Sequence, residues 1–263
     1  MSSKINWLVS HTSPSSIVLL PWLLEHGIGY SLAQKYAKSG WLKRLASGVY
    51  YRPDARNDAL PTWVEALHAL NSQLQLPVHL AGLSSLTHQG LSHYLPVSKE
   101  QVWLGVEQKS DLPKWFREFD SSSWSYCTNT KLELMAEKDL KTITVQGQEL
   151  KASCPELAAY EVVDAIGKLI SFEHAAELFQ GLVNLSPRKV QSLLERSDAI
   201  QANRIFLFLS HYHGHQWVKR LDESKIKLGS GKRQVVEGGR YDERYKITVP
   251  ITLDISKKEQ DYG

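Results

Sequence analysis

The chain has 263 residues, of which 42% are hydrophobic and 22% are charged. This balance is typical of a globular protein, and the length is sufficient for two domains. The best candidate for a membrane span, residues 17–24, contains Pro21 and is much shorter than the roughly 20 apolar residues that a span requires. The polar start of the chain does not resemble a signal peptide, so we expect a cytoplasmic protein. Cys127 and Cys154 have neither zinc nor disulfide spacing, and we expect both to be reduced packing residues.

Positive charge is concentrated at the two ends of the chain. The formal net charge is only +3, but residues 1–60 carry seven Lys and Arg against three acids, a net +4. Residues 217–263 carry eleven against eight, a net +3, which leaves the middle at −4. Phosphate groups of nucleic acid would be attracted to the basic ends. For the C-terminal end, ordinary solvated charge is an equally good interpretation.

The first 30 residues predict two helices. Ile5, Leu8 and Val9 lie at helical spacing within residues 4–11. Pro21 suits the first turn of a second helix over about 21–26, because its missing N–H would be unpaired there in any case. Glycines at 27 and 29 then allow a tight turn.

A third helix is predicted over residues 32–38. Ser31 and Gln34 have the spacing of a capping box, in which the serine hydroxyl accepts from the helix start and the glutamine reaches back. The apolar residues of the segment face a core, while Gln34, Lys35 and Lys38 lie on the open face. Gly40 is a suitable helix stop.

A short basic hairpin follows the third helix. Residues 41–45 and 49–52 predict two strands, joined by a turn at 46–48. Three helices followed by such a hairpin have the order of a winged helix–turn–helix, in which the third helix enters a major groove and the hairpin meets phosphate or the minor groove. The residues that we expect to contact duplex DNA are Ser31, Gln34, Lys35, Lys38, Lys43, Arg44, Ser47 and Arg52. The alternatives are a helical cap that docks on the rest of the chain and a module that binds protein.

A larger second domain is predicted from residue 59 onward. The polar segment 54–58 is the natural linker, which gives domains at 1–58 and 59–263. An amphipathic helix is predicted over 61–74, with Trp63, Leu67 and Leu70 on one face. The remaining predicted elements are strands over 101–106 and 141–145, a hairpin turn at 146–148, helices over 155–168, 171–182, 186–196 and 199–213, and strand-like sequence over 235–254. The fold class is therefore α+β: an N-terminal winged helix–turn–helix followed by a larger mixed α/β domain.

Catalytic patterns in the second domain are weak. Glu107-Gln108-Lys109 has the Glu-x-Lys form of metal-dependent nucleases, but such sites need a second carboxylate to hold the metal. No Asp lies between Asp58 and Asp111, so the pattern indicates the end of a strand. A DNA nuclease stays a lesser alternative, and we expect no enzymatic activity and no cofactor.

Two C-terminal features carry chemistry without a clear role. His211, His213 and His215 would face one side and ligate zinc if the segment were extended, but a polar helix end is favoured, so we expect no metal site. The glycine runs at 229–233 and 238–240 lack the spacing of a phosphate-binding loop. The cations beside them, Lys232, Arg233, Arg240 and Arg244, form a possible second basic surface, with a glycine-hinged hairpin carrying solvated charge as the alternative.

Several motifs together resemble the AbiEi family of antitoxins, the transcriptional-regulator half of type IV toxin–antitoxin pairs in abortive infection. Residues 29–31 (GYS) and 40–50 (GWLKRLASGVY) resemble the family's N-terminal domain, and 79–91 (HLAGLSSLTHQGL) resembles the segment that opens its second domain. Residues 152–158 (ASCPELA) resemble a helix start of the family, and 228–233, 238–241 and 245–250 resemble the C-terminal end of one subfamily. Each motif is weak alone, but their order is specific.

The resemblance implies a function beyond what the residues show. The N-terminal domain would bind inverted repeats in the protein's own promoter and repress the operon. The C-terminal domain would counteract a cognate nucleotidyltransferase-like toxin, encoded by the neighbouring gene, in phage defence or the maintenance of mobile elements. Direct binding to this toxin does not follow from the resemblance.

Overall fold

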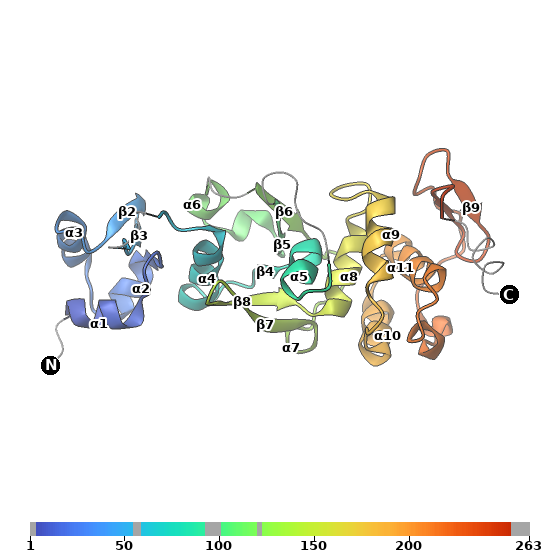
Figure 1. Cartoon of the computed structure of the whole chain (residues 1–263), viewed down its shortest axis with the longest axis horizontal. Helices are drawn as coiled ribbons and strands as arrows, with labels where there is room; N and C mark the ends of the chain where they lie inside the picture. The colour runs from blue at the N-terminus through green and yellow to red at the C-terminus, as the bar shows by residue number, and fades with distance from the viewer. Residues whose placement is uncertain (1–3, 55–58, 93–100, 120–122, 254–263) are drawn as a thin grey trace.

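The computed structural model describes residues 4–54, 59–92, 101–119 and 123–253. The chain forms an elongated α+β molecule in which the elements follow one another along the long axis, with the two termini at opposite ends (Figure 1). An N-terminal unit of three helices and a small sheet lies at one end, a mixed sheet lies in the middle, and helices with a small hairpin lie at the other end. No helix among the described residues is long and apolar enough to cross a membrane.

The N-terminal unit has the connectivity of a winged helix–turn–helix. Its elements are α1 (Lys4–His11), β1 (Ile17–Leu19), α2 (Leu20–Glu25), α3 (Tyr30–Lys38), β2 (Lys43–Ala46) and β3 (Val49–Tyr51). The three strands form an antiparallel sheet in the order β1-β3-β2. The predicted helices and hairpin are confirmed. Strand β1 was not predicted, because three apolar residues that run directly into a helix leave no period-two pattern.

This small sheet is buried on both faces. Val18 and Tyr50 pack with α1, α2 and α3 on one face. Ile17, Val49 and Tyr51 pack on the other face against α4 (Trp63–Gln73), which follows the predicted linker. Residues on both sides of position 58 therefore share one hydrophobic core. The predicted linker itself falls mostly on residues outside those described, and the boundary at 58 stays a prediction.

Helix α3 ends as predicted but begins differently. Gly40 has φ +79°, and the N–H groups of Gly40 and Trp41 donate to the carbonyls of Ala37 (3.3 Å) and Tyr36 (3.0 Å). This is a Schellman C-terminus, which requires the left-handed conformation that glycine adopts freely.

The predicted capping box at Ser31 is wrong. Gly29 occupies the N-cap without a side-chain hydrogen bond, which places Ser31 inside the first turn. The capping box that the structure does contain is at the start of α4, where Thr62 accepts from the N–H of Val64 and the Glu65 carboxylate accepts from the Thr62 N–H at 2.7 Å. Here the sequence Thr-x-x-Glu supplies a charged acceptor, which a glutamine at position 34 does not.

The middle of the molecule is a five-stranded mixed sheet in the order β6-β5-β4-β8-β7. Helix α4 covers one face and α5 and α8 cover the other. Both predicted strands are confirmed, and the predicted turn is a two-residue hairpin with positive φ at Gln146 and Gly147. The elements after α4 are β4 (His79–Leu80), α5 (Gly82–His88), β5 (Gln101–Gly105), α6 (Lys114–Arg117), β6 (Ser123–Cys127), α7 (Ala136–Asp139), β7 (Leu140–Val145) and β8 (Gln148–Ser153), with a 3-10 turn over Lys109–Asp111.

The C-terminal part packs four helices and a hairpin around one core. They are α8 (Pro155–Asp164), α9 (Phe172–Gln180), α10 (Pro187–Arg196), α11 (Ile200–Tyr212), β9 (Arg240–Asp242) and β10 (Ile247–Val249), with 3-10 turns over Val218–Arg220 and Glu223–Lys225. All four predicted helices are confirmed, although α8 ends four residues before the predicted end. Both cysteines are buried and unoxidised, and burial raises the pKa of each thiol, that of Cys154 to about 12.

One buried carboxylate ties the middle sheet to its helices. Glu161 of α8 is 1% exposed and accepts four hydrogen bonds. One oxygen accepts from the Gly82 N–H (2.8 Å) and the Ser153 hydroxyl (2.7 Å), and the other accepts from His79 Nε2 (3.2 Å) and Asn129 Nδ2 (3.1 Å). Because these donors come from β4, α5, β8 and the segment after β6, the carboxylate fixes their relative positions.

We predict that Glu161→Gln lowers the free energy of unfolding by about 3 kcal/mol. An amide replaces one acceptor oxygen with a donor, so two of the four buried donors lose their partner. Urea denaturation of the wild type and the variant measures the difference. The same substitution at the exposed Glu177 is the control, and an equal, small effect of both would contradict the role given to Glu161.

Candidate nucleic-acid interface

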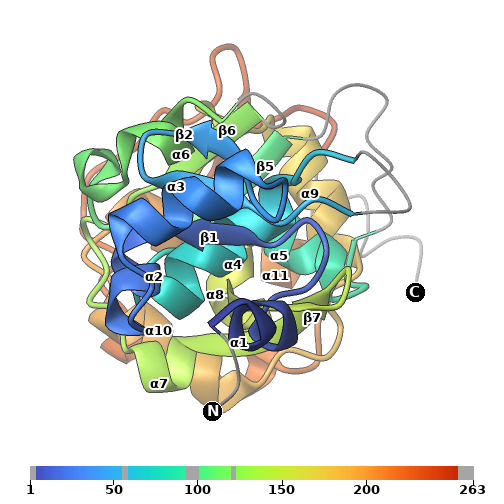
Figure 2. The ribbon, with the colours of Figure 1, turned by 90° about the vertical axis from the view of Figure 1, so that its left-hand side faces the viewer.

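Helix α3 presents a polar face at the free end of the molecule. Figure 2 looks onto this end, where α1, α2 and α3 face the viewer and the rest of the chain lies behind them. Ser31, Lys35 and Lys38 are exposed and follow one another at helical spacing, while Ala33 and Tyr36 are buried on the opposite side. The predicted open face is therefore correct for these three residues.

Gln34 belongs less clearly to this face. It is half-buried, and its side-chain amide donates to the Tyr50 hydroxyl at 3.2 Å. Tyr50 in turn pairs with Arg44 across the sheet. Gln34 and Arg44 thus flank one tyrosine, which brings the middle of α3 and the edge strand β2 together.

The two predicted hairpin cations lie on opposite faces of the sheet. Arg44 pairs with Tyr50, whose side chain faces the three helices, whereas Lys43 pairs with Tyr51, whose side chain faces α4. Since neighbouring residues of a strand point to opposite faces, only Arg44 shares the side of α3. Both are exposed.

The hairpin is a short wing. Ser47 is exposed in its two-residue loop, beside Gly48 with φ +70°. The Gly48 carbonyl accepts from the Leu20 N–H at 2.8 Å, and a Cβ at Gly48 would contact the Leu20 side chain at 3.6 Å. The tip is therefore packed against the start of α2 instead of extending into solvent.

Arg52 does not belong to the DNA-facing group. Its guanidinium Nη1 donates to the carbonyls of Val9, at 2.9 Å, and Thr12. It thereby satisfies carbonyls at the C-terminal end of α1 and joins that helix to the end of β3. The pattern of a basic hairpin could not distinguish this structural arginine from one that contacts phosphate.

The predicted second basic surface is largely committed to protein contacts. Lys232 lies 4.7 Å from the centre of the Tyr241 ring. Arg240 donates to the Leu253 carbonyl at 3.3 Å, and Arg244 pairs with Glu223 at 2.8 Å. Arg233 is exposed, and its backbone pairs with strand β10. These contacts favour the alternative of a glycine-hinged hairpin.

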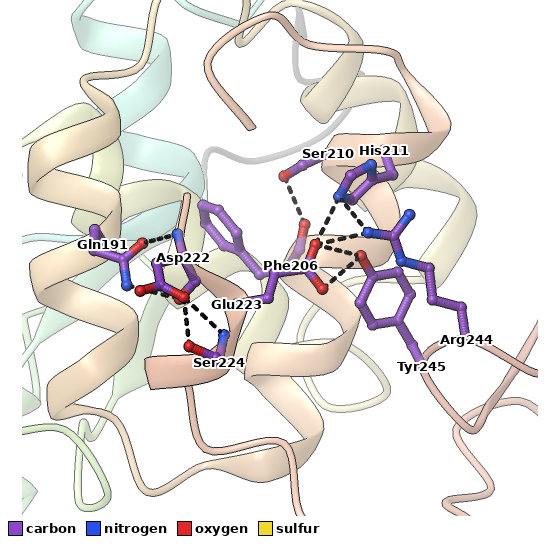
Figure 3. A network of polar contacts seen from close by, with 9 residues as sticks. All are labelled: Gln191, Phe206, Ser210, His211, Asp222, Glu223, Ser224, Arg244 and Tyr245. Atoms are coloured by element: carbon purple, nitrogen blue, oxygen red, sulfur yellow. Dashed lines mark hydrogen bonds and ion pairs between the residues drawn. The ribbon is translucent and has the colours of Figure 1, made fainter. Parts of the chain in front are cut away.

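Figure 3 shows the polar network that connects this hairpin to α11. Glu223 lies at its centre, 3.0 Å from His211 Nε2 and 2.8 Å from Arg244, and it accepts from the Tyr245 hydroxyl at 3.2 Å. Burial raises the pKa of Tyr245 well above its usual value, and the Glu223 charge adds to the effect. Burial lowers the pKa of His211; the bond to Glu223 partly opposes this, and Arg244 lowers it further.

The three clustered histidines have different partners. Helix α11 ends at Tyr212, so the predicted polar helix end is confirmed. His211 contacts Glu223, whereas His215 is buried, donates to the Phe179 carbonyl at 2.7 Å and stacks on Trp217. Within the described ranges, no group of three His, Cys, Asp or Glu side chains is arranged for a metal ion.

A buried arginine that the sequence gave no reason to select organises the glycine-rich segment. Arg204 of α11 is 2% exposed and donates to the carbonyls of Leu228 (2.5 Å), Gly231 (2.6 Å) and Lys246 (3.2 Å). The loop at 228–231 therefore wraps a cation with its carbonyls, the reverse of a loop that binds phosphate with its N–H groups.

The Glu-x-Lys pattern does lie at the end of a strand. Glu107 and Lys109 follow β5, and both are exposed. The ammonium group of Lys109 lies 4.8 Å from the centre of the Tyr126 ring.

Family models match nearly the whole chain. The N-terminal domain model of AbiEi antitoxin transcriptional regulators matches residues 1–97, and the model for the AbiEi antitoxin transcriptional regulator of type IV toxin–antitoxin systems matches residues 99–250. The chain belongs to the AbiEi antitoxin family. No curated protein matches the sequence.

A solved structure confirms the fold over the whole length. The crystal structure of the RV2827C protein from Mycobacterium tuberculosis matches with a TM-score of 0.63 at 13% identity, covering 98% of this chain and 93% of that one. At this identity the likeness shows the fold alone. One detail of the family assignment is corrected: residues 79–91 fall within the N-terminal model of the AbiEi family and do not open its second domain.

We predict that acidification weakens the AbiEi C-terminal hairpin through His211. A folded-state pKa below the usual 6.5 means that the folded protein binds fewer protons than the unfolded chain. The free energy of unfolding should therefore fall as the pH drops from 7.5 to 5.5. Urea midpoints at the two pH values should differ less in His211→Gln than in the wild type. The same difference in both would show that His211 does not contribute.

Proposed function

We propose that this antitoxin is a DNA-binding repressor of its own operon that acts through α3. The observation that carries the proposal is the exposed face of Ser31, Lys35 and Lys38, joined on the same side by Arg44. A helix of this kind fits a major groove, and the cations beside it neutralise phosphates. Its target would be inverted repeats in duplex DNA of its own promoter, which implies action in the cytoplasm.

The contacts divide the predicted residues into two roles. Lys35, Lys38 and Arg44 would meet phosphate or guanine, and Ser31 would contact the backbone of the DNA near the helix start. Gln34 would read adenine only by giving up its bond to Tyr50, so we assign it to the support of the interface. Ser47, at the packed tip of the short wing, would contact phosphate at the edge of the site.

We predict that Lys35→Ala, Lys38→Ala and Arg44→Ala combined weaken promoter binding roughly 100-fold, since each charged contact is worth on the order of 1 kcal/mol or more. Each single change should also reduce the slope of log affinity against log salt by about 0.9. Gel shift or fluorescence anisotropy with a promoter fragment measures both quantities.

Lys43→Ala is the matched control for these changes, because Lys43 is an exposed cation of the same hairpin on the other face of the sheet. It should leave affinity and salt slope nearly unchanged. Equal losses in Lys43→Ala and Arg44→Ala would overturn the assigned face, and promoter binding by neither wild type nor variants would overturn the repressor itself.

We further propose that the part of the chain beyond the winged helix counteracts a nucleotidyltransferase-like toxin encoded by the neighbouring gene, without enzymatic activity of its own. The antitoxin family supports a toxin partner in general terms. The buried core and satisfied polar contacts of α8–α11 support a rigid scaffold for this role.

We predict that toxin control and DNA binding separate genetically. When the neighbouring gene is expressed from a foreign promoter, the variant lacking Lys35, Lys38 and Arg44 charges should still restore growth as well as the wild type does. Loss of rescue, with unchanged protein level, would place toxin control in the DNA-binding face instead.

A further inference from the structure

A hollow of about 590 Å³ lies in the middle sheet, away from the DNA-facing unit. We call it the strand-end hollow. It is lined by residues that follow β5 and β6, among them Val106, Glu107 and Asn129, and by His79 at the start of β4. Strands β5 and β6 are parallel, so their carboxyl ends meet at this edge of the sheet. Ligands bind preferentially outside the carboxyl ends of parallel strands.

Two polar side chains of the lining are fixed from behind by Glu161. His79 Nε2 and Asn129 Nδ2 both reach the same carboxylate oxygen, at 3.2 and 3.1 Å. A carboxylate only accepts, so both side chains donate to it. The uncharged His79 ring then has its lone pair on Nδ1, a buried atom with no hydrogen-bond partner among the described residues. Likewise, the Asn129 amide has its carbonyl oxygen on the side away from Glu161.

The His79 ring has no freedom to leave this position. A Cβ at Gly105, its partner across the sheet, would lie 2.0 Å from His79 Nε2. The ring therefore occupies the space that a side chain at Gly105 would fill, packed directly on the backbone of β5. Such pre-organisation lowers the entropic cost of binding a ligand.

The charge of the hollow favours a cation. Glu107 contributes an exposed carboxylate, and none of the lining residues in the described chain is Lys or Arg. The hollow also lies in the acidic middle of the chain, whose net charge is −4. An anionic ligand would meet a like charge with no compensating cation, whereas a hydrogen-bond donor would meet acceptors only.

The residues present favour an organic cation over a metal ion. A metal site requires several ligating side chains in close geometry, and no such group of three is found in the part of the chain that the structure describes. We propose that the strand-end hollow binds a guanidinium or ammonium group, donating to the acceptors of His79 and Asn129 and pairing with Glu107. This site is independent of the DNA-binding face.

The test is titration of the full chain with butylguanidinium, followed by NMR of the histidine ring signals and by thermal melting. Butylurea, which has nearly the same shape without the charge, is the control ligand. Butylguanidinium should shift a buried histidine signal saturably and raise the melting temperature, and butylurea should do neither. Equal responses to the two compounds, or no saturable shift, would overturn the proposal.

Glu107→Gln provides the matched variant, because an exposed side chain can be changed without disturbing the fold. It should weaken butylguanidinium binding about two- to five-fold, the range expected for a solvent-exposed ion pair. Glu133→Gln removes an exposed carboxylate from the segment after β6 that does not line the hollow, and should leave binding unchanged. Equal weakening by both variants would indicate general electrostatic attraction and would contradict a site at Glu107.

Discussion

Strand β3 is buried on both faces, and the placement of the DNA-facing helix depends on it. Tyr50, 1% exposed, packs under α1, α2 and α3, and Tyr51, 5% exposed, packs against α4. A winged helix whose sheet had one solvated face would be free to move relative to the rest of the chain. Here Gln73 of α4 also bonds to the backbone of β1 at both Ile17 and Leu19. The recognition helix is therefore fixed at one end of a continuous core.

The same economy of positions separates two electrostatic regions. The cations of α3 and β2 lie at the free end of the molecule, where duplex DNA has access (Figure 2). The middle sheet is acidic and is organised by the buried carboxylate of Glu161, with the strand-end hollow on its edge. At the far end, the cations that the charge pattern singled out mostly stabilise the hairpin, as Arg244 does through Glu223 (Figure 3). A region that attracts phosphate and a region that favours donors thus lie on different parts of one rigid chain.

Local sequence signals predicted the elements that depend on local physics. The helix stop at Gly40 and the hairpin turn at Gly147 follow from positive φ, and the amphipathic helices follow from their periodicity. Strands β1 and β4 escaped because strands of three and two residues have no detectable alternation. The capping box at Ser31 failed because the helix begins one residue earlier, on a glycine cap that no side chain marks.

The candidate site was predicted in part, for a similar reason. Exposure of Lys35 and Lys38 follows from helical spacing, which a sequence contains. The roles of Arg52 and Arg204 depend on carbonyls of segments that are distant in the chain, Val9 for one and Leu228 for the other. Charge alone does not distinguish an arginine that meets phosphate from one that satisfies the backbone.

The most direct test of the DNA-binding face is an NMR titration of the full chain with a duplex of its own promoter. Backbone amide signals of α3 and of Arg44 should shift or broaden first, together with those of the wing tip at Ser47. Signals of β9 and β10 and of the residues around Glu161 should remain in place. Changes centred on the C-terminal hairpin, with α3 unaffected, would contradict the account.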